Sequence, residues 1–126
     1  MIKDLIRQGL RFALVGLVNT AVGLISIYAI LYFTNAGPFL ANGIGYAIGF
    51  SVSFMLNRAW TFEHKGPARK VLPRYLMVVA VAYLCNIAVV YYVIHFLHWD
   101  PYWAQPAGIV IYSTVTFIGS KSLVFK

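Results

Sequence analysis

Four long apolar stretches alternate with short polar segments along this chain. They cover residues 12–34, 39–56, 75–97 and 102–119, and none of the four contains Asp, Glu, Lys or Arg. A helix needs about 20 apolar residues to cross a hydrocarbon core of about 30 Å, and backbone polar groups in lipid must be satisfied within their own segment. The pattern predicts an all-α membrane protein with four transmembrane helices, which we expect to form a single domain over residues 1–126.

Ahead of the first stretch, apolar and polar residues alternate at helical spacing. Ile2, Leu5, Ile6 and Leu10 share one face, with charged and amide side chains opposite. This pattern predicts a short helix lying in the membrane interface. The apolar stretch that follows is longer than the core of a signal peptide, which reaches about 15 residues, so we interpret it as an uncleaved span.

Composition supports the membrane assignment. Hydrophobic residues make up 61% of the chain and charged residues 10%, whereas a soluble domain carries about 25% charged residues. A net charge of +7 would suggest nucleic acid as the partner of a soluble protein. Because the basic residues here lie between apolar stretches, anionic lipid headgroups are the expected neighbours, and no nucleic-acid partner is predicted.

The basic residues also predict the orientation of the spans. All ten Lys and Arg residues lie before the first stretch, between the second and third, or after the fourth. The connections 35–38 and 98–101 contain none. Short loops rich in Lys and Arg stay in the cytoplasm, so both termini and the central loop are expected there. Pro38 and Pro101 stand where helices would begin, and Asp100 is placed to cap the fourth helix.

The two halves of the chain repeat. A shift of 63 residues aligns residues 11–62 with 74–125 without a gap, and 12 of the 52 aligned pairs are identical, among them Arg11/Arg74 and Pro38/Pro101. Each unit contains an even number of spans, so both would have the same orientation. We therefore expect two tandem two-helix repeats, in parallel orientation, related by a pseudo-two-fold axis along the membrane normal.

Small and polar residues form a stripe on the second and fourth spans. In the second span, Asn42 precedes residues at four-residue spacing: Gly45, Gly49, Ser53 and Asn57. The equivalent positions of the fourth span are Gln105, Gly108, Tyr112, Thr116 and Ser120. Such stripes allow close helix packing, and they could also line a polar groove for a headgroup. Asn42 and Gln105 are the pair that most favours the second interpretation.

The cytoplasmic ends of these spans carry equivalent cations, Arg58 and Lys121. Two cations facing one another could bind a phosphate, and the planar guanidinium of Arg58 suits its oxygens. The alternative is that both residues are ordinary anchors that reach into the headgroup region.

The residues that would support catalysis or ion coupling are missing. No acid lies within a span, whereas coupled transporters usually depend on one. No nucleophile–base set, glycine-rich phosphate loop or metal motif is present. His95 and His98 lack supporting ligands apart from Asp100, and with the neighbouring tryptophans they suit an aromatic belt on the outer face. We expect no enzymatic activity, no cofactor and no metal.

The stretch Arg-Phe-Ala-Leu-Val-Gly-Leu-Val-Asn-Thr at residues 11–20 resembles the start of GtrA-family proteins. The resemblance continues at Ala41-Asn42 and Gly45 and reaches its most specific element in Asn-Arg-Ala-Trp-Thr-Phe at residues 57–62. It covers essentially the whole chain. Ser120-Lys121 stands where many relatives carry Asn and Arg, so the second half departs from the pattern.

This resemblance implies that the protein moves a polyprenyl-phosphate-linked sugar, such as undecaprenyl phosphate–glucose, to the outer leaflet of a bacterial inner membrane for polysaccharide biosynthesis. It also implies a membrane glycosyltransferase as partner. Position by position, the matched motif residues are Asn19, Asn42, Asn57, Arg58 and Trp60.

Three hypotheses remain. The leading one is a lipid-linked sugar flippase that works as a homo-oligomer, because four short helices scarcely enclose a path for a sugar. Its expected substrate-binding residues are Asn19, Asn42, Asn57, Arg58, Trp60, Gln105 and Lys121. The second is a scaffold that recruits the glycosyltransferase without transport. The third, a small multidrug exporter, would require an acid within a span.

Overall fold

The computed structural model describes all of residues 1–126, and every regular element in it is helical. Four helices are long and apolar enough to cross a membrane, so the prediction of an all-α, multi-pass membrane protein is confirmed. The elements are α1 (Ile2–Phe33), α2 (Pro38–Leu56), the π-helical turn η1 (Asn57–Thr61), α3 (Ala68–His95), α4 (Pro101–Gly119) and the π-helical turn η2 (Ser120–Val124).

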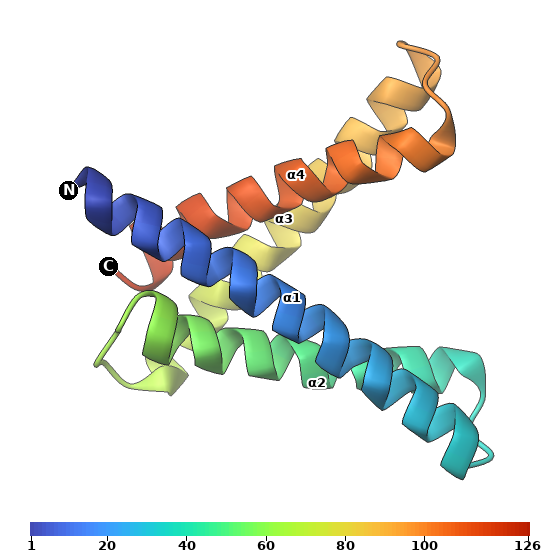
Figure 1. Cartoon of the computed structure of the whole chain (residues 1–126), viewed down its shortest axis with the longest axis horizontal. Coiled ribbons are helices and arrows are strands. Elements are labelled where there is room, and N and C mark those ends of the chain that lie inside the picture. The colour runs from blue at the N-terminus through green and yellow to red at the C-terminus, as the bar shows by residue number, and fades with distance from the viewer. The chain divides into compact units, whose positions relative to one another are not determined.

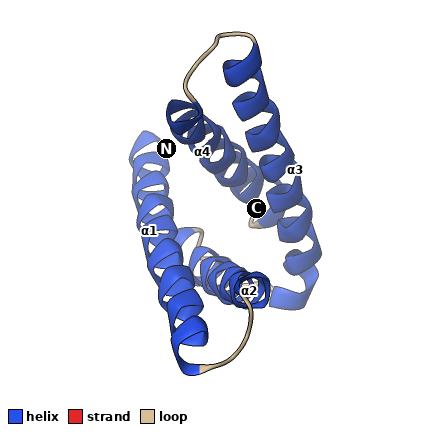
Figure 2. Ribbon diagram, turned by 90° about the vertical axis from the view of Figure 1, so that its right-hand side faces the viewer, coloured by secondary structure: helices blue, strands red, loops and turns tan.

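The chain divides into two compact units, Met1–Lys65 and Gly66–Lys126. Each is a hairpin of two antiparallel helices joined by a short turn, α1 with α2 in the first and α3 with α4 in the second (Figures 1 and 2). In both, a π-helical turn continues the second helix of the pair and packs against the first. That the two hairpins form a single domain stays a prediction.

The N-terminal amphipathic stretch is not a separate interfacial helix, contrary to expectation. It continues without a break into the first span, so that α1 runs for 32 residues. At 1.5 Å per residue this helix is about 48 Å long, which exceeds the hydrocarbon thickness of about 30 Å. No proline interrupts it, and Gly9 alone does not end a helix in the middle of a run of good helix formers.

The helix starts at the turns follow the sequence prediction. Pro38 and Pro101 each occupy the first positions of α2 and α4, where a missing N–H breaks no helical bond. Asp100 caps α4, because its Oδ1 accepts a hydrogen bond from the Tyr102 backbone N–H at 2.9 Å. The α3 helix starts earlier than the predicted span and includes Pro73 near its beginning.

The first hairpin closes along a seam of small residues on α2. Ala41, Gly45 and Gly49 are buried. A Cβ atom at Gly45 would overlap the side chain of Ile27 and would approach the Gly23 carbonyl oxygen to 3.1 Å. These residues therefore allow the backbones of α1 and α2 to approach closely, as the packing interpretation of the stripe requires.

The second hairpin has a corresponding seam on α4. A Cβ at Gly108 would come within 2.6 Å of both Asn86 Oδ1 and Val90 Cγ2. One at Gly119 would come within 2.6 Å of Val78 Cγ1. Real Cβ atoms do not approach so closely, so a larger residue at either position would require these α3 side chains, or α3 itself, to shift.

Candidate functional site at the ends of α2 and α4

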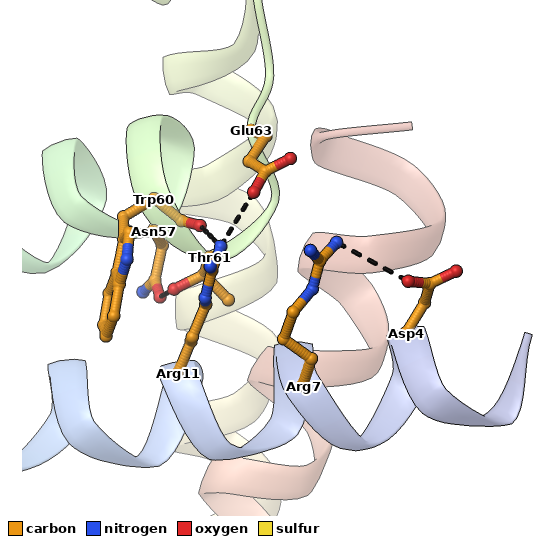
Figure 3. A network of polar contacts seen from close by, with 7 residues as sticks. All are labelled: Asp4, Arg7, Arg11, Asn57, Trp60, Thr61 and Glu63. Atoms are coloured by element: carbon orange, nitrogen blue, oxygen red, sulfur yellow. Dashed lines mark hydrogen bonds and ion pairs between the residues drawn. The ribbon is translucent and has the colours of Figure 1, made fainter.

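A ladder of polar side chains runs through η1 at the end of α2. The Asn57 amide donates to Ser53 Oγ at 3.2 Å. Thr61 Oγ1 donates to Asn57 Oδ1 at 2.9 Å (Figure 3). Asn57 and Thr61 are each 1% exposed. Buried polar groups are costly unless bonded, so the ladder explains how a polar motif can be buried here. Asn57 thus uses its side chain to stabilise the turn.

Arg11 of α1 secures the end of η1. Its Nη1 atom donates to the Trp60 carbonyl oxygen at 2.8 Å and to Glu63 Oε1 at 2.8 Å (Figure 3). Its guanidinium carbon also lies 5.1 Å from the centre of the Trp60 ring, within the range of a cation–π interaction. One arginine therefore binds the backbone, the acid and the ring that follow Arg58. We call this set of three contacts the Arg11 clamp.

The acid of the clamp occupies an unusual backbone conformation. Glu63 follows the C-cap residue Phe62 and has φ of 50°, in the left-handed region that helix ends usually fill with glycine. The hydrogen bond from Arg11, together with the positive charge of Arg7, lowers the pKa of Glu63 from its usual value. The carboxylate is thus the favoured form, and it neutralises Arg11.

Arg58 and Trp60 lie on η1 itself. Arg58 is half-buried, with its Nε atom inaccessible to solvent. Trp60 is 41% exposed, so its indole is accessible even though Arg11 lies over the ring. The five-residue turn η1 thus contains all three motif residues Asn57, Arg58 and Trp60.

In the second hairpin, η2 provides Ser120 and Lys121 at the positions of Asn57 and Arg58. Ser120 is fully buried, and its Oγ has no hydrogen-bond partner. Val124 stands in place of Thr61, so the polar ladder of η1 has no counterpart here. Lys121 is half-buried. The half that departs from the motif therefore has the same kind of turn but lacks the side-chain hydrogen bonds of η1.

The remaining predicted site residues lie away from the ends of α2 and α4 that carry η1 and η2. Asn19 is half-buried on α1, and its Oδ1 lies against Gly49 of the seam. Asn42 and Gln105 are exposed on α2 and α4, beside the buried seam residues Ala41 and Ala104. Neither amide is therefore part of the seam of its own hairpin.

The turn between α3 and α4 forms an open pocket lined by Trp99, Asp100 and Trp103. No group of three His, Cys, Asp or Glu side chains in the structure is arranged to hold a metal ion. Both tryptophans are exposed, as residues of a membrane-interface belt are.

The Arg11 clamp and the π-helical turns were not anticipated from the sequence. The available signals were indirect: Arg11 is one of the identical repeat pairs, and Glu63 is the only acid in the central loop. Helical periodicity gives no indication that the last turns of α2 and α4 widen, because the residues involved are compatible with an ordinary α-helix.

Comparison with known families gives one match. The model of the GtrA/DPMS transmembrane domain matches residues 11–125, which include α2, α4 and both π-helical turns in full. No curated protein and no solved structure matches the chain. A match over nearly the whole length shows the family: the chain belongs to the GtrA/DPMS transmembrane-domain family.

Proposed function

We propose that this protein translocates a polyprenyl-phosphate-linked sugar, such as undecaprenyl phosphate–glucose, from the cytoplasmic to the outer leaflet of a bacterial inner membrane. The sugar is then used in polysaccharide biosynthesis. The observation that carries the proposal is the family match over residues 11–125. The protein itself is not an enzyme in this proposal and needs no cofactor. A membrane glycosyltransferase supplies the substrate, and its consumption on the outer face drives transport.

The π-helical turn supports the placement of the phosphate. Arg58 sits on η1 at the end of an apolar helix, where a lipid phosphate lies. Its guanidinium suits phosphate oxygens, and Lys121 of η2 is the second candidate. Trp60 is accessible for stacking on the sugar, while Asn19, Asn42 and Gln105 are candidates to bind its hydroxyl groups.

The bounds of the elements support the proposed repeat and orientation. The ranges of α2 and α4, and those of η1 and η2, are each 63 residues apart. We propose two tandem repeats in parallel orientation, about 11–62 and 74–125, with both termini cytoplasmic, assembled as a homo-oligomer. Cysteines replacing Asn35 or Asp100 in a Cys85→Ala background should react with an impermeant thiol reagent added outside cells. One replacing Lys65 should not, and outside labelling there would contradict the orientation.

The direct test is leaflet-resolved transport of a labelled polyprenyl-phosphate sugar in vesicles that contain only this protein. Arg58→Lys should reduce the rate and Arg58→Gln should reduce it further, because Lys lacks the planar fork. If vesicles with the wild-type protein show no transport of the labelled lipid, the flippase proposal is contradicted. Equal transport rates for the wild type and Arg58→Lys would indicate that Arg58 is an ordinary anchor in the headgroup region.

A scaffold that recruits the glycosyltransferase is the second candidate function. It is favoured by small residues on exposed faces: a Cβ at Gly16 of α1 or Gly43 of α2 would meet no atom within 4 Å. Such positions suit close packing by a partner helix. The double substitution Asn42→Leu/Gln105→Met distinguishes the two functions. It should block outer-leaflet sugar modification by a flippase, yet leave both modification and glycosyltransferase co-purification intact for a scaffold.

A further inference from the structure

The carboxylate of Glu63 lies near two arginines of α1. Its Oε1 atom accepts a hydrogen bond from Arg11 Nη1 at 2.8 Å, and the charge of Arg7 helps to lower the pKa of Glu63. Arg7 itself has a longer contact of 3.6 Å with Asp4. Arg7 and Arg11 are four residues apart on one face of the helix, and both side chains extend from α1 toward the segment that carries Glu63 (Figure 3). Two cations that converge on one anion form an anion-binding site, and the anion that occupies it here belongs to the chain itself.

Glu63 is held in this site by few interactions. Its hydrogen bond to Arg11 joins one oxygen to one nitrogen. The Glu63 side chain is 54% exposed, and exposed ion pairs contribute little to stability. Glu63 also has a φ of 50°, in the left-handed region that disfavours residues other than glycine. A competing anion can therefore displace this carboxylate at a small cost in free energy.

Arg11 has N–H donors left for such an anion. A guanidinium carries five of them, and both hydrogen bonds of Arg11 come from Nη1, one to the Trp60 carbonyl oxygen and one to Glu63. The bond to Trp60 and the cation–π contact at 5.1 Å fix the position of the guanidinium without Glu63. Arg11 can thus hold a phosphate through two parallel bonds, which are stronger and more specific than one.

The position of the site in the chain suits a lipid phosphate. Arg11 immediately precedes the apolar stretch of residues 12–34, so it lies at the boundary between hydrocarbon and headgroups. Its partner Trp60 belongs to η1 together with Arg58, and the site therefore adjoins the arginine already proposed to bind phosphate. A phosphodiester has one negative charge and two free oxygens, as a carboxylate has. It can replace the carboxylate of Glu63 without a change in local charge.

We propose that Arg7 and Arg11 bind the phosphodiester of the lipid-linked sugar, and that Glu63 occupies their site as an internal competitor until the lipid displaces it. The identity of the ligand rests on the proposed function. The competition itself rests on the contacts of Glu63 with α1. Because Glu63 must leave for the lipid to bind, removing its charge should strengthen binding even though it weakens the Arg11 clamp.

The affinity of the full chain in detergent for undecaprenyl phosphate–glucose, measured by native mass spectrometry, tests the competition. Glu63→Gln should raise this affinity by about two- to five-fold, the value of an exposed ion pair. Asp100→Asn is the matched control, because it also removes one negative charge but lies at the start of α4; it should leave the affinity unchanged. A purely structural clamp predicts weaker binding by Glu63→Gln. An affinity that is unchanged or lowered in Glu63→Gln, or raised equally in Asp100→Asn, would overturn the proposal.

Two variants of α1 test the arginines. Arg11→Gln should lower the affinity by at least about ten-fold, the value of a hydrogen bond to a charged group. In that background Glu63→Gln should no longer raise it, and a persisting increase would show that Glu63 does not compete for Arg11. Arg7→Gln should lower the affinity by about five-fold. Lys3→Gln removes one positive charge from an exposed position of the same helix. It should change the affinity less than Arg7→Gln, and equal losses would overturn the role of Arg7.

Two further probes distinguish the sources of the phosphate. Phosphatidylglycerol is a phosphodiester of the same charge. Weaker binding that Glu63→Gln does not change supports the lipid-linked sugar as ligand, whereas an equal response would overturn that assignment. Displacement of the bound lipid by millimolar inorganic phosphate would also overturn it, and retention supports it. Binding is measured here without transport, so a failure of the competition and a failure of the flippase proposal are separate outcomes.

Discussion

Gly45 offers a sharp test of the seam in the first hairpin, because Gly43 two residues away provides a matched control. A Cβ at Gly45 would overlap the Ile27 side chain and press on the Gly23 carbonyl oxygen at 3.1 Å, while a Cβ at Gly43 would meet nothing within 4 Å. Both positions lie in the same helix. Replacing either glycine with alanine therefore has the same effect on the free energy of unfolding through the backbone. Only the change at Gly45 also affects packing.

The magnitude follows from two opposing effects. Alanine is favoured over glycine in a helix interior by up to about 1 kcal/mol. Overpacking a close contact costs about 1–3 kcal/mol. Gly43→Ala should thus leave the free energy of unfolding unchanged or raise it by up to about 1 kcal/mol. The free energy of unfolding of Gly45→Ala should be lower than that of Gly43→Ala by about 1–3 kcal/mol.

Reversible unfolding in mixed detergent micelles, titrated with sodium dodecyl sulfate and followed by helical circular dichroism, measures the difference. Gly23→Ala is a second control, on the α1 side of the same contact. Its Cβ would lie at an ordinary 3.7 Å from the Gly45 carbonyl oxygen, so it should not lower the free energy of unfolding. If Gly45→Ala proved as stable as Gly43→Ala, the close approach of α1 and α2 at this point would be refuted.

Three further predictions concern polar contacts. Thr61→Val should lower the free energy of unfolding by about 1–3 kcal/mol, because it leaves the buried Asn57 Oδ1 without its donor; Thr20→Val, at an exposed position, should change it little. Asp100→Ala should cost about 0.5–2 kcal/mol through loss of the cap on α4, and Asp100→Asn much less. The lowered pKa of Glu63 means that its ion pair stabilises the fold above the ordinary value of 4.5 and is lost as the pH falls through the lower folded value. Melting temperatures of the wild type and Glu63→Gln should therefore differ at neutral pH and converge in acid; a constant difference would argue against the clamp.

The spans could be predicted because lipid imposes a simple rule on length and composition. Pro38, Pro101 and Asp100 mark the helix starts through local chemistry that does not depend on tertiary structure. The close packing at Gly45 and Gly108 was one of the two interpretations that the sequence offered for the stripe, since glycine on a helix face lets a neighbouring helix approach closely.

The arrangement of the site was harder to predict from the sequence, because it depends on contacts between residues far apart in the chain. The bonds from Arg11 to Trp60 and Glu63 join residues 49 and 52 positions apart. The repeat aligned Arg11 with Arg74 but gave no indication that Arg11 would bond to Trp60 and Glu63. Asn57 was expected to bind a substrate through its amide, whereas in the structure that amide bonds to Ser53 and Thr61, each four residues away.

The hairpin organisation has a consequence for biogenesis. Each helix packs against its neighbour in the chain across a turn of residues 34–37 or 96–100, and such local pairing forms quickly. The second unit requires a further 61 residues of translation, about 3–12 s at about 5–20 residues per second. The first hairpin can therefore close in the membrane while the second is still being made. A defect at Gly45 would weaken the pairing of α1 with α2 throughout that interval, so membrane quality control could act on it before the second hairpin has been synthesised.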